Sequence, residues 1–136
     1  MACITVNEDY VCGVFNQLKE VLFDPEPREI NELTPVIKDV NITGIMGRNV
    51  QGIGIYMYGL PEMPIENVTI SNVNFDIIGP QKEFYAVMAF SREPSWGDGV
   101  FMENAEKMNH LNINCVSEKI TLKNCENIFL NEVQIA

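Results

Sequence analysis

The sequence predicts an all-β fold, a parallel β-helix made of a few short coils. Three observations predict it: a short motif recurs, its copies end at Asn or Gly, and helix signals are scarce. The motif reads apolar, any, apolar, any, Asn or Gly, apolar, and its copies begin at Val40, Val68, Val100 and Ile120. Two apolar side chains two positions apart describe a short strand with one buried face. Asn or Gly then tolerates the left-handed backbone angles of a bend.

The spacing of the bends is uneven, as expected for coils whose loops differ in length. Gly44 and Asn72 are 28 residues apart, whereas Asn104 and Asn124 are 20 apart. Successive coils of a parallel stack lie about 4.8 Å from each other. At that spacing Asn72, Asn104 and Asn124 could form a ladder of side-chain amides, and the alternative is a plain turn role for each.

The expected strands are apolar segments separated by turn-rich stretches at 59–64, 79–80 and 92–99. They comprise residues 4–6, 36–42, 53–58, 65–75, 84–90, 100–102, 111–116, 120–122 and 128–135. Residues 14–23 have apolar side chains at helical spacing and suit one short helix, which Pro25 ends. Because no linker or low-complexity tract interrupts the 136 residues, we expect a single domain over 1–136.

Composition excludes several classes of partner. The chain has 9 Lys+Arg against 19 Asp+Glu, a net charge of −10, which is the wrong sign for nucleic acid or an anionic membrane. With no long apolar run and no signal-like start, it is expected to be cytoplasmic. The four cysteines (Cys3, Cys12, Cys115, Cys125) and single histidine lack zinc or disulfide patterns, so we interpret the cysteines as reduced core residues and expect no metal or cofactor.

A family resemblance accompanies these patterns. Residues 58–73 (YGLPEMPIENVTISNV) resemble the late β-helix coils of bacterial glycoside hydrolase family 28, the polygalacturonases and their relatives. Residues 34–42 (TPVIKDVNI) are similar to the preceding coil, 86–90 with 99–101 to the following one, and 4–6 with 10–13 to a stretch after the catalytic region. The likeness covers nearly the whole chain but only the last third of a typical member. It implies a right-handed parallel β-helix of the pectin-lyase-like type.

The catalytic motifs of that family do not occur in this chain. The family cleaves galacturonan with inversion, using carboxylates in Asn-Thr-Asp and Asp-Asp, a histidine in Gly-His-Gly, and an Arg-Ile-Lys pair. None of the four is present, and His110 lacks flanking glycines. The resemblance therefore implies a polygalacturonase-like segment of pectin metabolism that is inactive alone.

Few side chains suggest a site. An inverting glycosidase needs an acid and a base roughly 6.5–9.5 Å apart. The carboxylates near expected bends are Asp9, Glu62, Asp98 and Glu103, which we interpret as ordinary surface acids. Tyr10 corresponds by resemblance to a substrate-contacting tyrosine, with a half-buried aromatic as the alternative. Trp96 beside Arg92 offers a second sugar contact, unless the tryptophan merely covers the flank of the coils.

Three functions remain open at this point. The first is the inactive polygalacturonase-like segment, the second a non-catalytic carbohydrate-binding or scaffolding solenoid, and the third an enzyme with an unrecognised carboxylate pair. An oligosaccharide or polysaccharide is the expected partner of the first two. We also expect homo-oligomers through the uncapped coil around Ile4 and Val6, unless residues 14–23 fold back as a cap.

Overall fold

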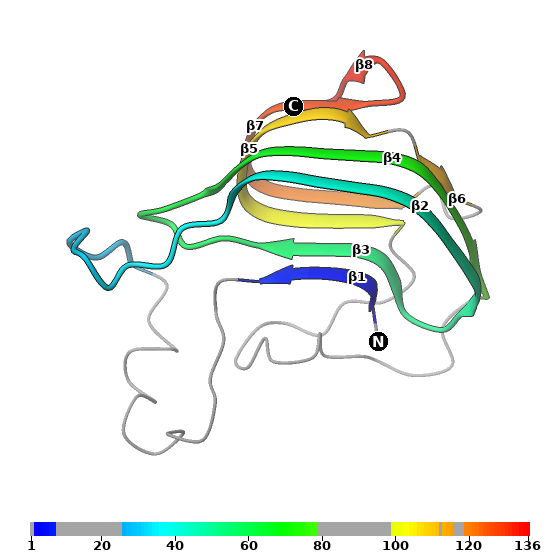
Figure 1. Cartoon of the computed structure of the whole chain (residues 1–136), viewed down its shortest axis with the longest axis horizontal. Coiled ribbons are helices and arrows are strands. Elements are labelled where there is room, and N and C mark those ends of the chain that lie inside the picture. The colour runs from blue at the N-terminus through cyan, green and yellow to red at the C-terminus, as the bar shows by residue number, and fades with distance from the viewer. Residues whose placement is uncertain (1, 8–25, 79–98, 112, 116–118) are drawn as a thin grey trace.

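The computed structural model describes residues 2–7, 26–78, 99–111, 113–115 and 119–136 (Figure 1). Within these ranges the chain forms strands and turns and no helix, so the all-β prediction is confirmed for them. The expected helix at 14–23 and the expected strand at 84–90 lie outside the described residues. No helix long and apolar enough to cross a membrane occurs in the part of the chain that was described.

In the described parts of the chain, eight strands form one curled sheet. They are β1 (Ala2–Asn7), β2 (Lys38–Val50), β3 (Ile53–Tyr58), β4 (Ile65–Ile77), β5 (Val100–Leu111), β6 (Ile113–Cys115), β7 (Ile120–Leu130) and β8 (Val133–Gln134). Pairing is parallel except between β7 and β8. Figure 1 shows β5 and β7 bending at the left of the view, so that each contributes to two layers. One layer holds β1, β3 and the first parts of β5 and β7, and the other holds β2, β4, β6 and their second parts.

The copies of the sequence motif stack in register. Val40 pairs with Val68, which sets Gly44 beside Asn72. Val100 pairs with Ile120, which sets Asn104 beside Asn124. The parallel stacking inferred from the repeat is therefore present at both pairs of motifs.

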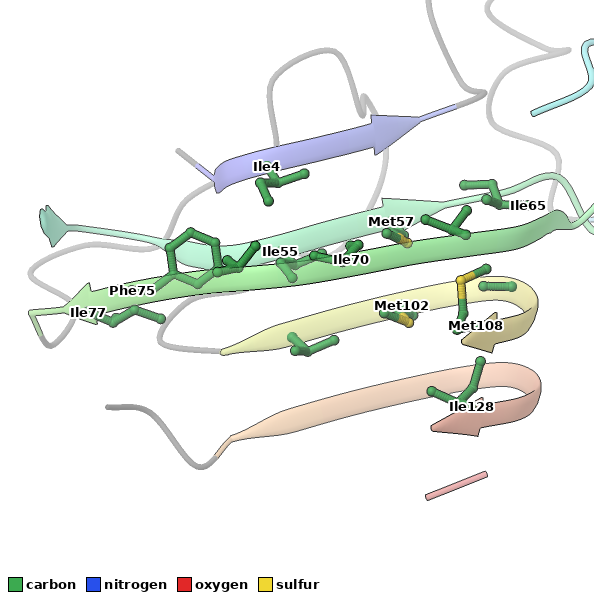
Figure 2. Close-up of a cluster of buried hydrophobic side chains, with 14 residues drawn as sticks. Ile4, Ile55, Met57, Ile65, Ile70, Phe75, Ile77, Met102, Met108 and Ile128 are labelled. Atoms are coloured by element: carbon green, nitrogen blue, oxygen red, sulfur yellow. The ribbon is translucent and has the colours of Figure 1, made fainter. Parts of the chain in front are cut away.

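The core lies between the two layers and consists of inward apolar side chains of β1 to β5 and β7 (Figure 2). Rows of apolar residues run from strand to strand, as in Met57, Met102 and Leu122. Ile55, Met57 and Met102 have no exposed surface. Each such side chain contributes about 1.5–3 kcal/mol by leaving water. On the other face of β3 a smaller buried cluster holds Ile53, Tyr56, Tyr58 and Phe101.

Left-handed residues recur at one aligned position of the stack. Asp39, Asn67, Lys107 and Asn127 occupy it with φ of 57°, 54°, 53° and 55°. Asp and Asn tolerate this conformation because their short polar side chains bond locally, whereas a lysine adopts it at a cost. The shared geometry keeps neighbouring strands in register through the bend.

Two expectations about strand ends are corrected. The strands do not stop at the bends: β5 runs through Asn104 and β7 through Asn124, because pairing continues on both sides of the left-handed residue. The single strand expected at 128–135 is wrong. Asn131 and Glu132, with φ of 47° and 70°, make a tight turn, and β8 folds back antiparallel on β7. Two left-handed central residues are the signature of a type I′ hairpin turn.

Candidate functional site

The three residues predicted to contact sugar lie outside the described part of the chain. Tyr10, Arg92 and Trp96 are therefore still predictions, as are the positions of Asp9 and Asp98. Glu62 is half-exposed in the turn between β3 and β4. Glu103 is half-buried on β5, where its backbone carbonyl accepts a 2.9 Å hydrogen bond from the Gly59 amide. Among the residues described, no group of three metal-binding side chains occurs.

A short asparagine ladder joins successive coils at one bend. Nδ2 of Asn104 donates to the Gly59 carbonyl oxygen over 2.9 Å, and Nδ2 of Asn124 donates to Oδ1 of Asn104 over 2.7 Å. Asn104 is buried, with 5% of its surface exposed, so the ladder is structural. Asn72 was expected in the same ladder, and that expectation is wrong. It lies on β4 beside Gly44, at a different bend.

An aromatic stack occupies the face of β3 and β5 that points away from the main core. The rings of Tyr56 and Phe101 are parallel within 7°, with centroids 5.0 Å apart. Lys123 Nζ lies 5.7 Å from the centroid of Phe101, within reach of a cation–π interaction. Both rings are buried, so this stack holds successive strands together and offers no open surface for a sugar.

The outer side of β2 and β4 carries a row of uncharged polar side chains, the polar face. It comprises Asn41, Thr43, Thr69, Ser71 and Asn74, all exposed or half-exposed. These residues alternate with the core side chains because successive residues of a strand point to opposite faces. The strand register brings Asn41 beside Thr69 and Thr43 beside Ser71. The Ser71 hydroxyl donates to Oγ1 of Thr43 over 2.9 Å.

The chemistry of the polar face suits binding and not catalysis. Hydroxyl and amide groups both donate and accept hydrogen bonds, as sugar hydroxyls do. None of the five is a carboxylate or a strong nucleophile. Sequence reasoning missed this face because it searched for charged and aromatic residues. The alternation of polar and apolar residues over 38–50 and 65–77 is the sequence signal that indicates such a face.

Searches of protein-family models, curated proteins and solved structures found no match for this chain. The charged residues of these two strands lie toward their ends: Lys38, Asp39 and Arg48 on β2, and Glu66 and Asp76 on β4.

Proposed function

We propose that this chain is a polygalacturonase-like segment of a right-handed parallel β-helix, serving pectin metabolism without catalytic activity of its own. One observation carries the proposal: the motif copies stack in parallel register, with Gly44 beside Asn72 and Asn104 beside Asn124. Stacked coils that turn at asparagine are what the family resemblance implies. The absence of all four catalytic motifs from the sequence supports inactivity.

Reducing-sugar release from polygalacturonate tests this proposal. We expect the purified chain to release no more reducing ends than buffer does. The matched control is the double variant Glu62→Gln/Glu103→Gln, which removes the two described members of the carboxylates that the sequence placed near bends, while keeping their shape. Turnover by the wild type that the double variant lacks would contradict the proposal and favour an enzyme with an unrecognised carboxylate pair.

A second candidate, favoured by the polar face, is a non-catalytic carbohydrate-binding module. Thr43, Ser71 and Asn74 present uncharged donors and acceptors on adjacent strands about 4.8 Å apart. The net charge of −10 opposes a polyanionic ligand, so an uncharged oligosaccharide is the better partner.

Isothermal titration with an uncharged oligosaccharide and with an oligogalacturonide distinguishes the two candidates. Saturable binding of the uncharged sugar is expected for a module. The triple variant Thr43→Ala/Ser71→Ala/Asn74→Ala should then weaken it at least about tenfold, since each lost hydrogen bond costs about 0.5–1.5 kcal/mol. Gln134→Ala, on exposed β8, is the control that should bind normally. Absence of any saturable binding would contradict the module.

A further inference from the structure

The two ends of the strand stack differ in how they are covered. At the C-terminal end β8 pairs with the outer edge of β7 at Phe129 and Leu130. The Ile135 amide donates to the Ile128 carbonyl over 2.8 Å, and the Ile128 amide donates to the Ala136 carbonyl over 3.1 Å. Figure 1 shows β8 lying beyond β7 at this end. The hairpin therefore occupies the edge where a further strand of the layer that holds β2 and β4 would pair.

At the opposite end two strands have an edge with no partner among the described residues. Within the described residues β1 pairs only with β3, and β2 pairs only with β4. β2 is the longer, at 13 residues, and its apolar side chains Val40, Ile42 and Ile45 are only half-buried. A long unpaired edge of this kind is a template for pairing with another chain.

We propose that two copies of this chain associate head to head through the free edge of β2. The stack aligns Val40 and Val68 of the second layer with Met108 and Ile128. A head-to-tail contact would therefore have to set β2 on the part of β7 that β8 already covers. Among the described strands of the layer that holds β2 and β4, only the like edges of β2 remain, and pairing of like edges gives a closed two-fold dimer.

The charges on β2 fit a two-fold antiparallel pairing. β1 has no charged residue and β2 has Lys38, Asp39 and Arg48, so this edge carries a net +1 (two cations, one anion) in a chain of −10. Asp39 and Arg48 are exposed and lie on either side of the middle of β2. Oδ1 of Asp39 also accepts a hydrogen bond from Nδ2 of Asn67 on β4, so an ion pair with a second copy would share that carboxylate. A two-fold axis near that middle therefore sets each Asp39 opposite the partner's Arg48. Oppositely charged cross-strand neighbours stabilise such a pair.

Charge reversal with rescue tests this interface, using sedimentation of the full chain from low to high micromolar concentration. We expect a dimer for the wild type and at least about tenfold weaker association for Arg48→Glu, which creates two like-charge contacts. Asp39→Lys/Arg48→Glu should restore dimerisation. A lysine fits position 39 because Lys107 has the same left-handed conformation at the aligned position. Lys119→Glu makes the same charge change just before β7, at the other end of the stack, and should leave the dimer intact.

Three results would overturn the proposal: a monomeric wild type at every concentration, no weakening by Arg48→Glu, or equal weakening by Lys119→Glu. A crosslink supplies an independent measurement. Thr43→Cys lies near the expected axis, so mild oxidation should give a disulfide-linked dimer beyond the wild-type background. Asn74→Cys, on the strand behind β2, should give none. The reverse pattern would place the contact away from the β2 edge.

Discussion

Asn124 donates a 2.7 Å side-chain hydrogen bond to Asn104, joining two bends that are 20 residues apart in sequence. Asn104 in turn donates to the Gly59 carbonyl. The buried side-chain amide of Asn104 thus bonds to Gly59 on one side and to Asn124 on the other. The ladder is the specific polar link between three successive turns of the chain.

Replacing Asn104 by alanine should destabilise the fold by about 2–4 kcal/mol. The change leaves the buried Gly59 carbonyl without its side-chain donor and forces alanine into a left-handed conformation, φ 52°. Asn104→Gly should recover about 1 kcal/mol, because glycine removes the backbone strain only. Urea unfolding followed by circular dichroism measures both.

Asn127 is the matched control for that experiment. It is exposed and left-handed, φ 55°, so Asn127→Ala should lose only the backbone contribution of about 1 kcal/mol. Equal losses at positions 104 and 127 would mean that the ladder hydrogen bonds contribute nothing to stability.

Gly54→Ala should destabilise the protein by about 1–3 kcal/mol through overpacking. A Cβ on Gly54 would lie 2.5 Å from the Gly99 carbonyl oxygen and 3.0 Å from Cδ2 of Phe75. That oxygen cannot withdraw freely, because it accepts a 3.0 Å hydrogen bond from the Ile55 amide. Thermal unfolding midpoints give the comparison.

A substitution at Gly44 measures the cost of a left-handed backbone without the steric clash expected at Gly54. Its Cβ would meet nothing within 4 Å, but its φ is +74°. Gly44→Ala should therefore cost about 1 kcal/mol and Gly44→Asn less, as Asn72 adopts φ 54° at the adjacent bend. A Gly54→Ala protein as stable as the wild type would contradict the close approach of β3 to Gly99.

Glu132→Gly should stabilise the chain by about 0.5–1 kcal/mol. Glu132 is left-handed, φ 70°, at the second central position of the hairpin turn, where glycine is preferred. Glu126→Gly, at an exposed β7 residue that is not left-handed, is the control and should destabilise by about 0.5–1 kcal/mol. Equal effects of both glycines in urea unfolding would argue against the tight turn.

Much of the fold could be predicted because its signals are local. Alternation set the bounds of β3 at 53–58, and the asparagine bends set the register of the motif copies. The hairpin at the C-terminal end could not be predicted, since Glu132 is not a residue type that marks a left-handed turn. The place of Asn72, at a different bend from Asn104, could not be predicted either. The lengths of the loops decide which bends align, and the sequence spacing alone does not give them.

The candidate site was harder to predict than the fold. Asn41 and Thr69 are adjacent only once the register of β2 and β4 is known. Each alone is an unremarkable polar residue on a strand. The aromatic and charged candidates Tyr10, Arg92 and Trp96 stood out by residue type, and their contribution to a site is still a prediction.

Cys125 should react slowly with alkylating reagents at mildly alkaline pH. Its Sγ lies 3.2 Å from the Lys123 carbonyl oxygen and 3.6 Å from that of Met102. Burial of the side chain raises the pKa of the thiol above its ordinary 9.0, and the nearby Glu103 charge raises it further. Because the thiolate is the nucleophile, alkylation at this position should accelerate only above that pH. Mass-spectrometric mapping of iodoacetamide adducts measures the rate.

The raised pKa of the Cys125 thiol makes the free energy of unfolding depend on pH. As pH rises through 9.0 the unfolded chain loses the Cys125 proton before the folded chain does, so the free energy of unfolding falls. Cys125→Ala removes that loss, and its stability relative to the wild type should therefore rise between neutral and strongly alkaline pH under reducing conditions. A pH-independent difference, or alkylation of folded Cys125 as fast as in urea, would show that the thiol is not held protonated by its surroundings.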